Sequence, residues 1–261
     1  MAPSVPPQVI PRPVDWRPGG PPPWGALPSE RRASIGLARV QAALDAAGQA
    51  GPVPADVGKD GIFEAPVVGE MPAPLRDVNA GVLAAFFEEA GEARVILTRR
   101  SSGLRTHQGQ VSFPGGRLDE GENAVAAALS EAFEEVDLDP SLVTTIGWLH
   151  PVLTMVSASY ILPVLGTVEG RPELVANPGE VERIFDVALA ELADPAVFHE
   201  ERWRIPGRVI AGSEDNSFPV WFFEVSGELI WGATARMLYE LLSVVLAGSN
   251  GSDSTVATSP S

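Results

Sequence analysis

Three glutamates set at helical spacing are the residues of this sequence best suited to chemistry. Glu131, Glu134 and Glu135 lie at i, i+3 and i+4, so a helix beginning near Asn123 would project all three carboxylates from one face within about one turn. Like charges at this spacing repel each other. The sequence has no Lys or Arg from 118 to 170, so no neighbour on the helix can neutralise these acids, whereas a divalent cation that prefers oxygen ligands could.

The residues around these acids favour a helix docked on a sheet beside a ligand. A helix face that is simply acidic and solvated is the alternative, and it is common. Here the opposite face is small and apolar, which is typical of a docked helix, with Val125, Ala128, Leu129, Ala132 and Val136. Upstream, Gly115 and Gly116 follow Phe113 and Pro114, and glycine allows the backbone to take positive φ and to approach a ligand closely.

The spacing of these residues resembles the Nudix box. The matching positions are Gly116, Glu122, Glu131, Glu134, Glu135 and Leu138. Two positions depart from it, because Ser130 stands where the family has arginine and Asp137 where it has glycine. Asp tolerates the left-handed conformation that ends many helices. In the family the arginine braces the glutamates, so Ser130 leaves open a weakened enzyme or a binding or regulatory module that keeps the fold.

The run from Leu97 to Gly116 is similar to the signature that precedes the box in the coenzyme A diphosphatase branch of this family. The resemblance covers about 78–246 and implies an α/β fold, a Nudix-type α/β/α sandwich with a mixed sheet. It implies Mg²⁺ or Mn²⁺ as the cofactor, a small-molecule diphosphate such as coenzyme A or its thioesters as the substrate, and 3′,5′-ADP and 4′-phosphopantetheine as products. Another nucleoside diphosphate derivative is the alternative substrate.

The resemblance also implies roles for individual residues. Glu131, Glu134 and Glu135 are expected to bind the metal, Glu122 to orient them, and all four to serve catalysis. The substrate-binding residues are expected to be Arg99, Arg100, Arg105, Gly115 and Gly116. Arginine forks suit phosphate, and these arginines lie in a basic stretch directly before the box. Glu180 is either an additional carboxylate or an exposed loop acid, and His107 either lies near the substrate or stabilises a turn.

Composition excludes several classes of protein. The formal net charge of -16 over 261 residues argues against a nucleic-acid binder. The absence of cysteine excludes thiolate sites. No stretch reaches the ~20 apolar residues needed to cross a bilayer, and the N-terminus lacks the pattern of a secretory signal. We therefore expect a cytoplasmic protein without nucleic-acid or membrane partners, and leave its oligomeric state open, with a homodimer as one option.

The remaining chain divides by composition and periodicity. Residues 1–32 are rich in proline and are expected to form a flexible arm that lies on the body through its tryptophans. Residues 33–77 are expected to hold a helix, to about Ala47, and an irregular connection. Strands are predicted at 82–87, 94–98, 144–148, 160–168, 218–225 and 229–231, and a helix after Gly232. Residues 247–261 are expected to be disordered.

Overall fold

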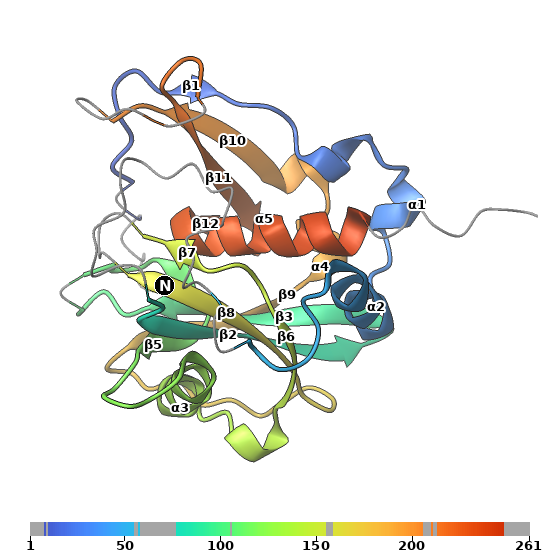
Figure 1. Cartoon of the computed structure of the whole chain (residues 1–261), viewed down its shortest axis with the longest axis vertical. Coiled ribbons are helices and arrows are strands. Elements are labelled where there is room, and N and C mark those ends of the chain that lie inside the picture. Colours follow the sequence, from blue (N-terminus) through green and yellow to red (C-terminus); the bar gives the residue numbers. More distant parts are fainter. Residues whose placement is uncertain are drawn as a thin grey trace, which may run out of the picture.

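The computed structural model describes residues 8, 10–54, 57, 77–104, 106–154, 159–205, 210 and 213–247. These residues form two β-sheets and the helices that cover them (Figure 1). Arg105, most of the expected irregular connection and the tail from residue 248 lie outside the described residues.

The larger sheet carries the candidate site. Its central strands are ordered β4-β3-β2-β8-β6, while β5 pairs with β2, β7 with β8 and β9 with β3. The β2–β8 pair is parallel and the other pairs are antiparallel, so the sheet is mixed as predicted. The strands are β2 (Ala80–Glu89), β3 (Glu92–Arg100), β4 (Val111–Ser112), β5 (Gly115–Arg117), β6 (Thr144–Trp148), β7 (Val152–Leu153), β8 (Tyr160–Thr167) and β9 (Val181–Ala188).

Helices cover both faces of this sheet. On one face, α3 (Ala124–Val136) packs its small apolar side chains on β2 and β8. On the other face lie α2 (Leu37–Ala47) and α5 (Gly232–Ala247), in a second core with β2 and β3. The predicted α/β/α sandwich is therefore confirmed. Of two short helices, α4 (Leu189–Leu192) buries both of its leucines in this second core, whereas α1 (Ser29–Arg32) has no buried residue.

A second, four-stranded sheet packs on α5 on the side away from the larger sheet (Figure 1). Its strands run in the order β1 (Arg17–Pro18), β10 (Phe198–Trp203), β11 (Phe218–Val225) and β12 (Glu228–Trp231). The sequence predicted β11 and β12 as a strand pair, which is confirmed, but it did not predict the sheet to which they belong.

The described part of the proline-rich segment, residues 10–32, packs against the body. β1 pairs with β10, and Trp24 is only 2% exposed, with its ring centroid 5.6 Å from that of Phe198 and 5.5 Å from that of Tyr239. A buried aromatic side chain removes a large apolar area from water and so stabilises the folded state. For these residues the expected contact through a tryptophan is present, and Trp24 anchors the otherwise largely exposed segment to the core.

The predicted hairpin before the site is also present. β2 and β3 pair in antiparallel fashion around Ala90 and Gly91, whose φ angles are 53° and 80°. Positive φ at both turn residues matches the twist of the flanking strands. β2 is buried along most of its length, as a central strand of a sheet covered on both faces must be.

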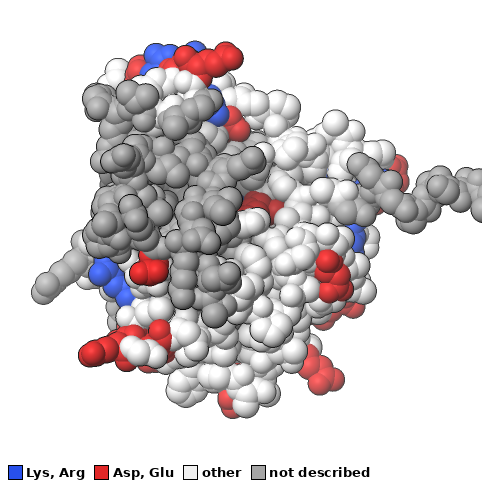
Figure 2. Space-filling view, viewed as in Figure 1, with Lys and Arg blue, Asp and Glu red and all other residues white. Residues whose placement is uncertain are grey.

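The charge distribution agrees with the composition. In Figure 2 the acidic side chains of the described residues are scattered over this face of the molecule, and the basic ones that can be seen lie in separate small spots. Among the described residues no helix combines the length and apolar character that a membrane crossing requires.

Candidate active site

The start of α3 is fixed by its cap and by close contact with the sheet. Asn123 caps the helix, because its Oδ1 accepts hydrogen bonds from the backbone N–H groups of Val125 and Ala126, each at 3.0 Å. A Cβ at Gly81 of β2 would lie 2.1 Å from the carbonyl oxygen of Ala124. Only glycine at this position lets the helix backbone approach the strand so closely.

The end of α3 has the conformation expected from the resemblance. Asp137 is the C-cap residue, with φ 58° and ψ 32° in the left-handed region. Its backbone N–H donates to the carbonyl oxygens of Ala132 and Phe133. The aspartate therefore occupies the conformation in which the family has glycine, and the helix keeps its length and its end.

Glu135 is the most buried of the three acids, at 1% exposure. Both of its carboxylate oxygens are held, since Arg100 Nη1 donates to Oε1 at 3.2 Å and the backbone N–H of Gly115 donates to Oε2 at 3.3 Å. Burial raises the pKa of Glu135 to about 7, although Arg100 and Gly115 oppose this rise. The carboxyl can thus change its protonation state near neutral pH, which suits a group that transfers protons.

Glu131 lies directly against the glycine-rich strand. A Cβ built on Gly116 would be 1.9 Å from Glu131 Oε1, so the carboxyl group fills the space that any other side chain at 116 would need. Burial, together with the charges of Glu134 and Glu180, raises the pKa of Glu131, and Arg100 opposes the rise. The charge of Arg100 therefore acts on both Glu131 and Glu135, while the charge of Glu131 raises the pKa of Glu135.

The remaining acids of the group are more exposed. Glu134 is exposed and accepts a hydrogen bond from the Ser130 hydroxyl at 3.4 Å. Glu122 is half-buried, and its Oε2 accepts from the backbone N–H of Asp119 at 3.0 Å. The charge of Glu122 also acts on Glu131, so all four glutamates expected from the sequence belong to one electrostatic group.

Glu180 joins this group from another loop. Its charge raises the pKa of both Glu131 and Glu135. Two backbone hydrogen bonds hold its loop near the site, because Asn177 N–H donates to the Glu135 carbonyl oxygen at 2.9 Å and Ser101 N–H donates to the Glu180 carbonyl oxygen at 2.7 Å. The structure therefore favours the interpretation of Glu180 as an additional carboxylate of the site.

The arginines named from the sequence separate in space. Arg100 contacts Glu135, whereas Arg99 Nη1 donates to Glu228 Oε2 of β12 at 3.1 Å. Arg183 binds the same buried Glu228 at 2.8 Å. Glu135 belongs to α3 and Glu228 to the layer beyond the opposite face, so adjacent arginines serve different layers. The sequence analysis assigned Arg99 and Arg100 to the same role and did not identify Glu228. The signal that could have separated the two arginines is strand alternation, which sends adjacent side chains to opposite faces of a sheet.

His107 has the contact expected of a turn residue. Its Nδ1 lies 2.8 Å from Gln110 Oε1, and its φ is 58°. The Gln110 backbone N–H also donates to the His107 carbonyl oxygen at 3.2 Å. These bonds account for the histidine as a turn-stabilising residue.

The acids suit a divalent ion by their chemistry. Among the described residues no group of three or more His, Cys, Asp or Glu is arranged to hold a metal as the side chains stand. The oxygen donors nevertheless fit Mg²⁺ or Mn²⁺, and the mutual repulsion that raises the pKa of Glu131 is what a bound cation would relieve. An ion would have to draw the exposed Glu134 toward Glu131 and Glu135.

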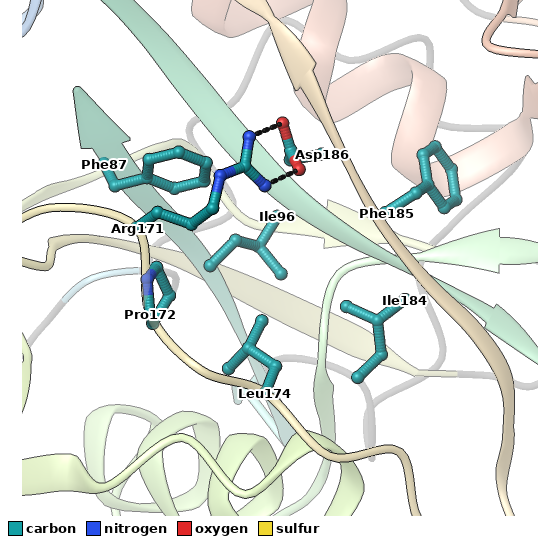
Figure 3. Close-up of a pocket in the computed structure, with 8 residues that line it drawn as sticks. All are labelled: Phe87, Ile96, Arg171, Pro172, Leu174, Ile184, Phe185 and Asp186. Atoms are coloured by element: carbon teal, nitrogen blue, oxygen red, sulfur yellow. Dashed lines mark hydrogen bonds and ion pairs between the residues drawn. The ribbon is translucent and has the colours of Figure 1, made fainter. Parts of the chain in front are cut away.

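A separate cavity of about 220 Å³ lies on the same face of the sheet as α3. Figure 3 shows Arg171 above the Phe87 ring and bonded to Asp186, with Ile96 and Leu174 beside them. None of the described residues that line the cavity belongs to the carboxylate group. The charge of Arg171 in this cavity is matched by Asp186 and Glu89.

Comparison with known proteins identifies similar chains. The model of the NUDIX domain matches residues 77–206. Nudix hydrolase 15, mitochondrial, from Arabidopsis thaliana is 36% identical over 181 residues, which cover 66% of this chain and 60% of that protein. The Nudix hydrolase NudL of Photorhabdus laumondii is 35% identical over 153 residues, which cover 58% of this chain and 76% of that protein. The chain thus spans about three fifths of the length of the plant relative.

Solved structures of low sequence identity are also similar. A MutT/nudix family protein from Enterococcus faecalis has a TM-score of 0.40 and 11% identity, covering 66% of this chain and 63% of that one. The NUDIX domain of Shewanella oneidensis NrtR, solved with ADP ribose, has a TM-score of 0.35 and 17% identity, covering 44% of this chain and 75% of that one.

Proposed function

Because this chain belongs to the Nudix hydrolase family, we propose that it hydrolyses the diphosphate bond of a nucleoside diphosphate derivative, with coenzyme A or its thioesters as the substrate class. The products are 3′,5′-ADP and 4′-phosphopantetheine or its acylated form. The signature from Leu97 to Gly116, which resembles the coenzyme A diphosphatase branch, supports this choice of substrate.

One observation carries the proposal of diphosphate chemistry. The carboxyl groups of Glu131 and Glu135 lie against the backbone of Gly116 and Gly115, with the Arg100 guanidinium on the same group. Several acids and one cation beside a backbone without side chains form a surface that a metal-bound diphosphate can approach closely.

In the proposed mechanism Glu131, Glu134 and Glu135 would hold a divalent ion, Mg²⁺ or Mn²⁺, and that ion would supply charge neutralisation of the diphosphate and a lower pKa of the attacking water. Glu122 holds the loop before α3 through the backbone of Asp119 and keeps its charge near Glu131. A glutamate whose carboxylate is not used as a ligand accepts the proton of the attacking water.

Fewer arginines are proposed to contact phosphate than the sequence suggested. Arg100 lies at the glutamates, whereas Arg99 is bound to Glu228, and Arg105 lies outside the described residues. Gly115 and Gly116 offer backbone rather than side-chain contacts. Arg105 therefore stays the proposed phosphate contact, because Arg99 and Arg100 are each paired with a buried glutamate.

A panel of substrates tests the proposal. Purified full-length protein is incubated with coenzyme A, an acyl-coenzyme A, ADP-ribose and a nucleoside triphosphate, each with Mg²⁺, with Mn²⁺ and with a chelator. The proposal expects metal-dependent cleavage with coenzyme A or its thioesters preferred. A clear preference for another nucleotide derivative would support the proposed diphosphate hydrolysis but refute coenzyme A as the substrate class.

Variants test the assigned residues in the same assay. Glu134→Gln and Glu135→Gln are each expected to lower the rate by at least about a hundred-fold, the usual effect of losing acid-base or electrostatic help. Glu120→Gln is the matched control, since this exposed acid lies outside the group. Native rates in both variants would refute the assignment.

The second candidate function is a binding or regulatory module without turnover. It is favoured by Ser130, which is exposed and bonds Glu134 through a neutral hydroxyl only. If the native chain lacks metal-dependent hydrolysis and Ser130→Arg restores it, this second function is the correct one.

A cytoplasmic location also stays a proposal, since the plant relatives are named as mitochondrial and chloroplastic proteins.

A further inference from the structure

We infer that Arg100 is the positioning residue of the Glu135 carboxylate, and that it supplies from β3 the brace that the box arginine supplies in the family, where this chain has Ser130. The inference rests on the proposed function, because it concerns the same group of carboxylates. In this chain an arginine of β3 would thus replace the box arginine of the family.

Each oxygen of the Glu135 carboxylate accepts one hydrogen bond from the protein. Arg100 Nη1 donates to one oxygen at 3.2 Å and Gly115 N–H to the other at 3.3 Å, and the residue is 1% exposed. Water is therefore nearly absent around this carboxylate, so its charge depends on a protein cation. Among the described residues, Arg100 is the cation in direct contact with it.

Ser130 does not hold this carboxylate. Its hydroxyl donates to Glu134 at 3.4 Å on the exposed part of α3. A hydroxyl has no net charge and can offer one donor only. The position that carries the brace in the family is thus occupied by a group that cannot offset the charge of a buried carboxylate.

The backbone of β3 explains why Arg100, and not Arg99, reaches α3. The pairing of β3 with β9 shifts register between these two residues, because Arg99 pairs with Arg183 and Arg100 with Val181. The extra residue of this bulge, Glu182, lies on β9, so it is the alternation of side chains along β3 that turns Arg100 toward α3 and Arg99 toward the opposite layer. Both backbone groups of Arg100 are bonded to the neighbouring segment, since its N–H donates to the Gln110 carbonyl at 2.9 Å and its carbonyl accepts from Gly109 N–H at 3.1 Å.

A guanidinium outside the metal's coordination would act by holding the Glu135 carboxylate in one orientation. Groups that orient a ligand in this way typically change metal affinity or activity by about 10- to 100-fold when removed. A phosphate-binding arginine would instead change substrate affinity and leave metal affinity as it was. Metal binding without substrate therefore separates the two roles.

The experiment titrates Mn²⁺ into the full-length protein and follows free Mn²⁺ by electron paramagnetic resonance. The variants are Arg100→Met, which removes the charge at similar length, and Arg100→Lys, which keeps the charge without the planar fork. Glu120→Gln, at an exposed acid outside the group, is the control. Arg100→Met is expected to weaken Mn²⁺ binding at least about ten-fold, Arg100→Lys to fall between it and the native protein, and Glu120→Gln to bind as the native protein does.

A double-mutant cycle in the hydrolysis assay shows whether Arg100 acts through Glu135. If it does, Arg100→Met lowers kcat in the native background and has little further effect in Glu135→Gln. Additive effects, or native Mn²⁺ affinity in Arg100→Met with a raised KM only, would overturn the inference and leave the proposed function intact.

Failure of the proposed function looks different, because the native chain would then bind no Mn²⁺ and hydrolyse none of the substrates. Circular dichroism of each variant establishes that it is folded. Should Arg100→Met fail to fold, Arg100→Lys decides the question, since native affinity and kcat in that variant would show that the fork geometry is not needed.

Discussion

Replacement of Glu135 by glutamine is expected to flatten the dependence of the stability of the metal-free protein on pH. Burial raises the pKa of Glu135 to about 7 from its ordinary 4.5. Between these two values the folded protein binds a proton that the unfolded chain has released. The free energy of unfolding therefore falls as pH rises through this window, and the stabilisation is complete only below the pKa of the unfolded chain.

The size of the effect follows from the two pKa values. Their difference corresponds to about 3 kcal/mol, and about 2 kcal/mol or slightly more of it falls between about pH 5 and about pH 8, because part of the unfolded chain's titration occurs below that range. Glutamine is neutral at every pH, so Glu135→Gln removes this contribution to the slope.

The assay is urea unfolding of native protein and variant across this pH range with a chelator present. His150, whose hydrogen bond to Glu240 raises its pKa, titrates in both proteins, so the difference between the two curves reports Glu135 together with its coupling to Glu131. Glu120→Gln is the control and is expected to keep the native slope. Parallel curves for native protein and Glu135→Gln would refute the reasoning that burial of this carboxyl dominates.

Three further predictions concern packing and one ion pair. Gly116→Ala puts a Cβ 1.9 Å from Glu131 Oε1, so the displaced carboxyl is expected to lower kcat about a hundred-fold with the fold retained; a native kcat would contradict the contact. Trp24→Ala is expected to lower the free energy of unfolding in urea by about 3 to 5 kcal/mol, since its ring is buried, and a negligible loss would show that the segment is not part of the core. Arg12→Met leaves the buried Glu201, bound at 2.6 Å, without this cation. Because Arg12 is partly exposed and Trp203 Nε1 still donates to Glu201, a loss of about 1 to 3 kcal/mol is expected by the same measurement; an unchanged midpoint would show that the pair contributes nothing.

Several elements of the fold could be predicted because their signals are local. The apolar stripe of α3 and the apolar runs at 82–87 and 94–98 are signals that depend on neighbouring residues only. Asn123 and Asp137 at the ends of α3 act through contacts within a few residues. The second sheet could not be predicted in the same way, because β1 pairs with β10 across most of the chain.

The candidate site shows the same division at the level of single residues. Arg99 and Arg100 are adjacent in sequence and were assigned the same role, yet one binds Glu228 and the other Glu135. Strand geometry sends adjacent side chains in different directions, and a register shift lies between these two residues. Neither the shift nor the partner of each arginine is visible without the pairing of β3 with β9.

The sequence by itself determined that Glu131, Glu134 and Glu135 share one face of a helix, because the helical repeat places residues three and four apart side by side. Only the tertiary structure decided that Glu135 is buried, that Glu134 is exposed, and that Arg100 meets Glu135 across 35 residues of chain. Burial and ion pairing arise from contacts between distant segments, so they depend on how α3 docks on the sheet.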